Sequence, residues 1–305
     1  MPEILLKNMR GDDALLFRSA CGLIHVLSEL PRWAASTLRW EGTFAVLGAP
    51  GDLEDLVADL DNVYATRVDD PRWSWASRGR GTREEYRAAI AVHQDHAGRL
   101  AWIRGTGTDQ VDVTKSGEPC TAGSSFDSKQ GGSYKSIFTV AWTSMRSMAE
   151  RPSRADVILD ALLHGELVEV VDHHLNWLPQ QPRGGAWAGK RLEMIHKTCQ
   201  PFVLALAVES LALFPVNGRG GRRARTAGFT ADGQAFSWGL WSRPVDRDSL
   251  QMILDHPALH DDEIKQDDLR ALGFHAAFRS RRFTPDKEVM WTHPLPLLAR
   301  TGRGT

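Results

Sequence analysis

The fold is decided by the stretch Cys199-Gln-Pro-Phe-Val-Leu-Ala-Leu-Ala-Val-Glu-Ser-Leu-Ala-Leu-Phe-Pro-Val216, which runs directly into Asn217-Gly-Arg-Gly-Gly-Arg-Arg-Ala-Arg225. Pro201 suits the first turn of a helix, where its missing N–H leaves no bond unmade, and Pro215 ends the helix. Apolar residues surround most of this helix, so we expect it to be buried on all sides. A core helix is therefore predicted to end in a basic, glycine-rich loop.

The loop after this helix suits phosphate better than a packed interior. Its three glycines leave the backbone mobile, and its four arginines gather positive charge. The alternative interpretation is an ordinary solvated surface loop. The candidate phosphate contacts are Arg219, Arg222, Arg223 and Arg225, with Asn217 as a weaker candidate.

Composition restricts the class of protein. The chain has 305 residues, of which 42% are hydrophobic and 25% charged, as in globular proteins that bury a core. The formal net charge is −1, so the chain has no overall basic field. Any nucleic-acid surface is therefore expected to be a local basic patch that acidic residues balance elsewhere.

The cysteines and the apolar runs indicate a compartment. Cys21, Cys120 and Cys199 are odd in number and far apart, so we expect no disulfide framework, no structural zinc and a reducing cytoplasm. No signal peptide is evident before Lys7, and the longest apolar run, 202–208, is too short to cross a bilayer. The prediction is a cytoplasmic protein that needs no membrane and no cofactor.

The order of the apolar patterns predicts an α+β fold, in which an N-terminal mixed α/β unit precedes a mainly helical region with short β-hairpins. Ile4–Leu6 is expected to be a strand, Asp12-Asp13 to cap a helix that runs to about Leu30, and Glu41-Gly42 to turn a hairpin. Leu100–Arg104 is also predicted to be a strand and Arg247–Leu259 a helix, and Ala231-Asp-Gly233 is an Asp-Gly signal for the turn of a second hairpin. The predicted divisions are an N-terminal α+β domain over 1–111, a loop over 112–135 and a C-terminal domain with basic loops and short strands over 136–305.

The loop over 112–135 is the second candidate site. It is rich in Gly, Ser, Thr and Lys, and it leads into a helix predicted from Tyr134 to Ala149. Exposed backbone N–H groups before a helix N-terminus form an anion site through geometry and dipole. An ordinary flexible linker with a Ser133 helix cap is the alternative. The residues proposed to contact phosphate or a base edge are Lys129, Gln130, Ser133 and Lys135.

Two motifs suggest catalysis, and neither is complete. Asp172, His173 and His174 are possible metal ligands, and this tripeptide also marks a phosphoesterase family, but adjacent histidines on a strand point to opposite faces. In the segment 184–190, which resembles a P-loop, Arg191 takes the place of the Ser or Thr that would reach magnesium. We therefore predict a protein without a metal site or a catalytic set. A metal-dependent nuclease or phosphoesterase that uses the tripeptide remains the alternative.

A second arginine cluster lies near the C-terminus. Arg279, Arg281 and Arg282 follow a strand-like sequence, Phe274–Phe278, and alternate side chains on a strand share a face. If this strand lies beside the first arginine loop, the two clusters form a continuous basic stripe, which is typical of a nucleic-acid surface.

Several segments resemble proteins of the type I-G (formerly I-U) CRISPR effector operons. Many members of the large-subunit family there are longer, so the resemblance fits a reduced version or the smaller companion protein of the same operons. The similar segments in the second half are Ala207-Val-Glu-Ser-Leu-Ala-Leu-Phe-Pro-Val216, Arg225-Thr-Ala-Gly-Phe229, Phe236-Ser-Trp-Gly-Leu-Trp-Ser-Arg-Pro244, Leu269-Arg-Ala-Leu-Gly273 and Phe278-Arg-Ser-Arg281. The segments similar to the opening and the central loop of the large subunit are Phe17-Arg-Ser-Ala-Cys-Gly-Leu-Ile24, Leu38-Arg-Trp-Glu-Gly42 and Ser124-Ser-Phe-Asp-Ser-Lys-Gln130.

The resemblance implies a non-catalytic component of a crRNA-guided surveillance complex, or Cascade. Such a subunit binds target duplex DNA, recognises the flanking motif (PAM) and helps to recruit a helicase-nuclease in trans, while guide pairing supplies sequence specificity. Its expected partners are the crRNA-containing backbone subunits, the target DNA and the helicase-nuclease. Lys129, Gln130 and Lys135 are then the candidates for the groove, and the arginines hold the DNA backbone in place. The alternative is a scaffold subunit that contacts only protein and guide RNA.

Overall fold

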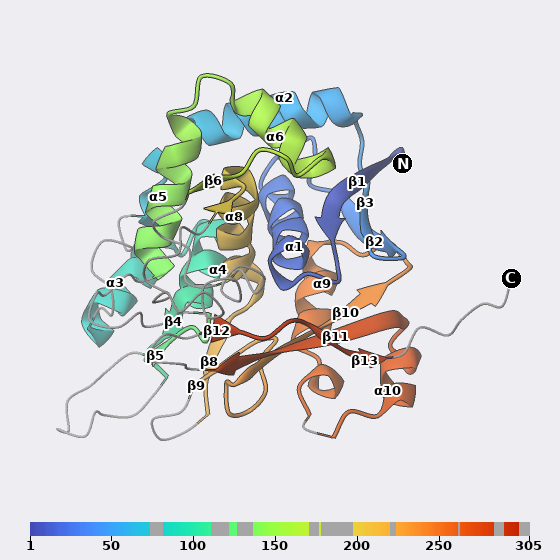
Figure 1. Cartoon of the computed structure of the whole chain (residues 1–305). Helices are drawn as coiled ribbons and strands as arrows, with labels where there is room; N and C mark the ends of the chain where they lie inside the picture. The colour runs from blue at the N-terminus through green and yellow to red at the C-terminus, as the bar shows by residue number, and fades with distance from the viewer. Residues whose placement is uncertain are drawn as a thin grey trace, which may run out of the picture.

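Two buried helices, α1 (Ala14–Ser28) and α8 (Pro201–Glu209), form the centre of the molecule (Figure 1). All residues of α8 are buried, and Pro201 occupies its first turn, as the sequence predicts. The computed structural model describes residues 1–73, 82–110, 122–126, 137–170, 177, 198–219, 224–261, 263–283 and 290–298.

Helix α1 lies against α8 through small and polar groups that allow a close approach. Asp13 caps α1, because its carboxylate accepts the backbone N–H groups of Leu15 and Leu16. Ser19 Oγ donates a hydrogen bond to the Val203 carbonyl of α8 at 2.8 Å. At Gly22 the two backbones lie so close that a Cβ atom would overlap a carbonyl oxygen of α8. The two helices therefore pack with almost no side chain between them at this point.

A three-stranded antiparallel sheet covers the other side of α1. The predicted hairpin is confirmed: β2 (Thr37–Glu41) and β3 (Phe44–Gly48) flank a turn in which Gly42 has a φ of 61°. Strand β1 (Glu3–Arg10) completes the sheet in the order β1-β3-β2 and is longer than predicted. Helix α6 (Arg154–Leu163) packs on β1, and α2 (Leu53–Thr66) packs on α6.

The second sheet comes from the C-terminal part of the chain and is joined to the first. Trp238 Nε1 donates to the Gly11 carbonyl and Trp241 Nε1 to the Leu38 carbonyl, each at 2.7 Å. The predicted Asp-Gly turn places Gly233 at a φ of 70°. The four strands are β10 (Ala235–Trp241), β11 (Phe274–Phe283), β12 (Met290–Trp291) and β13 (Leu295–Leu298).

Two local predictions are wrong. The strand expected over Leu100–Arg104 is part of helix α4 (Ala97–Thr106), because His96 caps it and because helical spacing brings Trp102 and Ile103 together in the core. The helix expected over 247–259 is divided into α9 (Arg247–Leu254) and the 3-10 turn η5 (Pro257–Leu259), since proline does not continue a helix.

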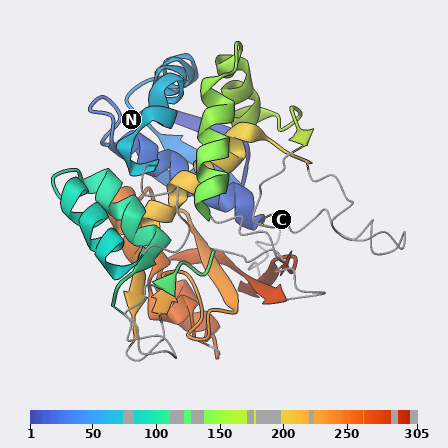
Figure 2. The same cartoon turned by 90° about the vertical axis from the view of Figure 1, so that its left-hand side faces the viewer.

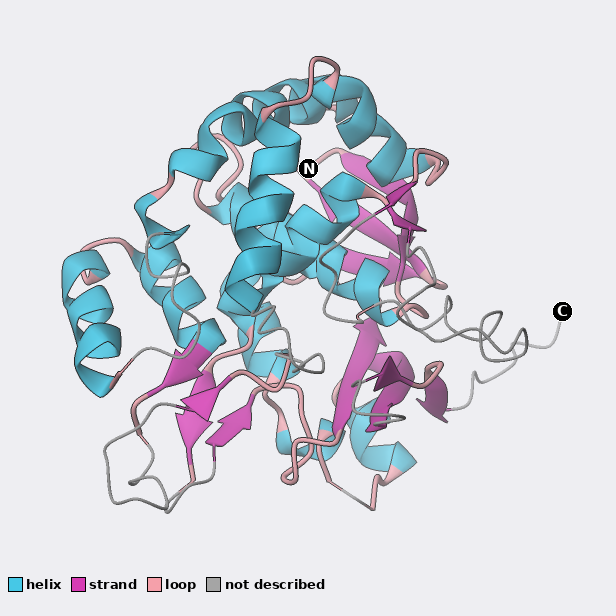
Figure 3. Ribbon diagram, turned by 60° about the vertical axis from the view of Figure 1, so that its left-hand side comes forward, coloured by secondary structure: helices cyan, strands magenta, loops and turns pink. Residues whose placement is uncertain are grey.

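The remaining elements complete a mixed α+β fold, as predicted (Figures 2 and 3). Figure 3 shows the strands gathered in separate small sheets around the central helices. These elements are η1 (Arg67–Asp69), α3 (Arg83–His93), β4 (Gly107–Thr108), β5 (Ala122–Gly123), α5 (Ile137–Ala149), β6 (Glu169–Val170), β7 (Thr198–Cys199), η4 (Ser210–Leu213), β8 (Val216–Gly218), β9 (Ala224–Thr226) and α10 (Gln266–Ala271).

One hydrophobic core contains residues from both sides of the segment 112–135. The division of the chain at this segment stays a prediction. Within the described ranges, no helix combines the length and the apolar character that crossing a membrane requires.

Candidate nucleic-acid surface and an adjoining cleft

The arginine-rich loop connects the two strands of a short hairpin. Asn217 of β8 pairs with Arg225 of β9, and Gly218 pairs with Ala224. Asn217 and Arg219 are exposed. Arg222 and Arg223 lie outside the described residues. The hairpin therefore places at least one unburied guanidinium at the start of the basic loop.

Arg225 fixes the base of this hairpin to α9. Its guanidinium forms an ion pair with Asp255, the residue that follows the helix, and its side chain is only 17% exposed. Burial raises the pKa of Asp255, against the opposing effects of Arg225 and Arg219. Arg225 thus has a protein partner that a phosphate would have to displace.

Arg279 requires a correction, because it lies inside the protein and not on a basic stripe. Its side chain is part of the buried face of β11, with the residue 6% exposed. The guanidinium donates to Ser237 Oγ at 2.9 Å and to the Asp261 carbonyl at 2.8 Å. These neutral acceptors satisfy a charge that burial would otherwise make costly. Arg281 is exposed and Arg282 is half-buried, so only these two of the cluster remain candidates.

The two arginine clusters approach each other at His260. Burial, together with the charges of Arg225 and Arg279, lowers the pKa of His260 to about 4. Its Nε2 atom lies 3.0 Å from the Leu254 carbonyl at the end of α9. One arginine from each cluster thus acts electrostatically on the same buried imidazole, so the base of the hairpin and β11 lie close together.

The described start of the second candidate loop lies beside the hairpin. The Ser125 N–H donates to Thr226 Oγ1 of β9 at 2.6 Å. The Phe126 carbonyl accepts the indole N–H of Trp177 at 2.9 Å. The continuation, with Lys129, Gln130, Ser133 and Lys135, lies outside the described residues, as do Asp172, His173 and His174.

Arg18 of α1 holds Phe126 and Trp177 together. Its guanidinium carbon lies 3.9 Å from the centroid of each ring, and its Nη2 atom donates to the Ala207 carbonyl of α8 at 2.9 Å. Burial lowers the pKa of Arg18 to about 9, a value that still leaves it charged at neutral pH. No sequence motif singles out Arg18; the available signal is a single arginine within a mainly apolar helix.

A cleft of about 1190 Å³ opens next to the hairpin. It lies where the C-terminal end of α1 meets α3, α4, β8 and α9, and Asn217 forms part of its wall. Tyr86 on another wall donates its hydroxyl to the Gly107 carbonyl at 2.9 Å. Its neighbours in the sequence group Asn217 with the basic loop, whereas the structure places it between that loop and the cleft.

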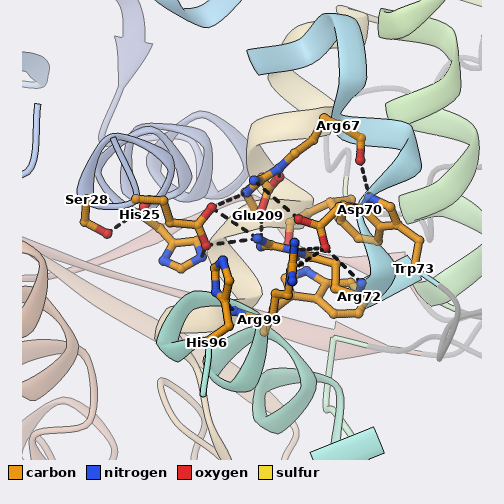
Figure 4. A network of polar contacts seen from close by, with 12 residues as sticks. His25, Ser28, Arg67, Asp70, Arg72, Trp73, His96, Arg99 and Glu209 are labelled. Atoms are coloured by element: carbon orange, nitrogen blue, oxygen red, sulfur yellow. Dashed lines mark hydrogen bonds and ion pairs between the residues drawn. The ribbon is translucent and has the colours of Figure 1, made fainter. Parts of the chain in front are cut away.

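A buried network of charges lies behind the cleft (Figure 4). Glu209 of α8 is fully buried and accepts from Arg67 Nε at 2.6 Å and from Arg72 Nη1 at 3.3 Å. Glu29 accepts from Arg72 Nη2 at 3.0 Å. Burial acts to raise the pKa of Glu29, but the two arginines outweigh it and hold that pKa below its usual range.

His25 lies between this network and the cleft. It belongs to the cleft wall, is 1% exposed, and neither ring nitrogen has a hydrogen-bond partner among the described residues. Its Nε2 atom is 3.6 Å from Glu29 Oε1. Burial lowers the pKa of His25 to about 3, against the opposing effect of Glu29, so the ring is neutral at physiological pH. Figure 4 shows the ring directed from α1 toward the wall that carries His96.

Among the residues that the structure describes, no group of three or more His, Cys, Asp or Glu side chains is arranged to hold a metal ion. Cys21 and Cys199 are buried free thiols, and burial raises the pKa of both. No model of a known protein family matches the chain, and a search of curated proteins found no match.

Proposed function

We propose that the chain is a non-catalytic, DNA-binding subunit of a type I-G CRISPR crRNA-guided complex, similar to the large subunit of that complex. In this role it binds target duplex DNA, recognises the flanking motif and helps to recruit the helicase-nuclease. The observation that carries the proposal is the β8–β9 hairpin, which holds exposed Arg219 at the start of the arginine-rich loop. The sequence resemblance supplies the kind of complex.

The base of the hairpin supports a role in holding a DNA backbone. Arg225 binds Asp255 on one side, and Thr226 accepts the N–H of Ser125 on the other. Because both sides of the base are bound to the rest of the protein, the two strands that flank the basic loop keep their position when phosphate binds, which lowers the entropic cost of association. Arg281 and Arg282, at the end of β11, are the second group of residues proposed to contact phosphate.

Phosphate contacts position a protein on DNA but carry no sequence information. Reading of the flanking motif is therefore assigned to Lys129 and Gln130, with Ser133 and Lys135 beside them. Their described neighbour, Ser125, is hydrogen-bonded to β9, so the proposed reading loop starts beside the proposed phosphate-binding hairpin.

The test combines Arg219→Ala, Arg222→Ala and Arg223→Ala and measures DNA affinity over a series of salt concentrations. Each lost phosphate contact lowers the slope of log affinity against log salt by about 0.9, so the triple variant should lose up to about 2.7. Discrimination between flanking motifs should persist, because these arginines position the DNA and do not read it. Arg225 is left unchanged because its ion pair fixes the hairpin.

Arg270→Ala is the matched control, since Arg270 is an exposed arginine of α10 that pairs with Asp267. It should leave the salt slope unchanged. An unchanged slope in the triple variant would show that the hairpin arginines contact something other than DNA phosphates, and would favour a scaffold subunit.

A further inference from the structure

The cleft beside the hairpin carries an excess of negative charge. Three of its carboxylates have arginine partners, at Glu29, Asp109 and Asp248. Asp95 and Asp246 also line it, and neither has an ion pair within the described ranges. The lining also contains one arginine without an ion pair in those ranges, Arg104. Two unneutralised carboxylates against one guanidinium favour a cation and disfavour phosphate.

His25 supplies an independent reason to expect a ligand. A neutral imidazole has one nitrogen that accepts a hydrogen bond, and the ring of His25 has no hydrogen-bond partner in the described part of the chain. A buried polar group without a partner destabilises a protein unless something supplies the missing bond. A donor that enters the cleft would satisfy this acceptor.

We propose that the cleft binds an arginine or lysine side chain that projects from a partner protein. The charged head would donate to His25 and to the carboxylates of Asp95 and Asp246. Ile90 and Leu100, which also line the cleft, would contact the methylene stem. The cleft exceeds the roughly 300–1,000 Å³ of most small-molecule pockets, so it has room for the backbone around such a side chain.

This inference goes beyond the proposed function, because it involves a protein partner and needs no nucleic acid. The cleft has an excess of negative charge, whereas the basic loop is positively charged, although Asn217 borders both. Failure of the DNA test would leave the cleft proposal intact, and failure of the peptide test below would leave the DNA proposal intact.

The probe is a blocked peptide of sequence Ala-Ala-Arg-Ala-Ala, titrated into the whole protein by calorimetry or NMR. The matched peptide carries citrulline, which keeps the shape of arginine and removes its charge. We expect the arginine peptide to bind at least about tenfold more tightly, because charge-assisted hydrogen bonds are the stronger ones. Equal binding of the two peptides, no saturable binding of either, or spermidine that binds as tightly as the arginine peptide would each overturn the proposal.

Three variants locate the binding, and a fourth, Asp267→Asn, is the control. Asp95→Asn and Asp246→Asn should each weaken the binding of the arginine peptide several-fold. Asparagine at position 246 can still cap α9. Asp267→Asn, which removes an exposed carboxylate from α10, should change nothing. His25→Phe keeps a ring in place but removes the acceptor, so it should weaken the binding of the arginine peptide without lowering the melting temperature of the protein. Normal peptide affinity in His25→Phe would assign His25 a purely structural role and sink the proposal.

Discussion

Several charged residues of this protein are buried. Glu209 lies fully buried in the apolar helix α8, and Arg72 is also fully buried. Each charge is stable there only because oppositely charged partners neutralise it; Arg67, Glu29 and Asp70 belong to the same network. Removing one partner from such a network leaves an uncompensated charge in a region of low polarity.

Glu209→Gln should therefore lower the free energy of unfolding by about 3–5 kcal/mol. Glu150→Gln is the control, since Glu150 forms an exposed pair with Arg146 on α5 and should change stability by about 0.5 kcal/mol or less. Guanidinium unfolding of both variants measures the difference. Similar stabilities for the two would mean that the Glu209 carboxylate is not the central acceptor of the network.

At the level of elements, the decisive contact is the close approach of α1 to α8. A Cβ atom on Gly22 would overlap the Leu206 carbonyl oxygen, which belongs to the backbone and has little freedom to move. Gly273 differs, because a Cβ there would meet nothing within 4 Å, but its φ of 84° is one that other residues adopt with strain. The two glycines are therefore required for different physical reasons.

Gly22→Ala should destabilise the protein by about 3 kcal/mol or more, although alanine favours helices, because the two helices must separate. Gly273→Ala should cost about 1–2 kcal/mol, the strain of its backbone conformation alone. Thermal unfolding compares the two. If Gly273→Ala were the more damaging variant, the closeness of α1 and α8 would not govern stability.

For the molecule as a whole, buried neutral histidines make stability depend on pH. Burial lowers the pKa of His25 to about 3 and that of His260 to about 4, whereas in the unfolded chain each histidine titrates near pH 6.5. Above pH 6.5 neither state binds these protons. Between pH 6.5 and the folded values the unfolded state binds more protons, so stability falls as the pH falls.

Each of these histidines should therefore lower the free energy of unfolding by up to about 1.4 kcal/mol for each pH unit below 6.5. His25→Phe should lose its share of this dependence and be less sensitive than the wild type between pH 6.5 and 4. Urea unfolding at several pH values tests this. A variant with the full wild-type dependence would show that His25 is protonated in the folded state.

Local signals in the sequence predict local structure here. The apolar segment after Pro201, the Asp12-Asp13 cap and the Glu41-Gly42 turn predict α8, α1 and the first hairpin, because each depends on neighbouring residues. The strand expected over 100–104 is a helix, since a short apolar run has no periodicity that separates the two.

The candidate site could be predicted only in part. Alternation along β11 indicates which arginines share a face, but the packing of the sheet decides that Arg279 points inward. The contact of Arg18 with Trp177 and the network around Glu209 join residues far apart in sequence. The residues next to Arg18 and Glu209 in the sequence do not indicate which distant residues each of them contacts.

The pairing of α1 with α8 has a consequence for how the chain is made. Arg18 and the Ala207 carbonyl that it binds are 189 residues apart, so α1 leaves the ribosome well before the helix against which it packs. At about 5–20 residues per second, the apolar surface of α1 waits roughly 10–40 s for its partner. Long-range contacts of this kind also slow folding. During that interval the surface of α1 that later contacts α8 lacks its partner, and exposed apolar surface of this kind favours aggregation.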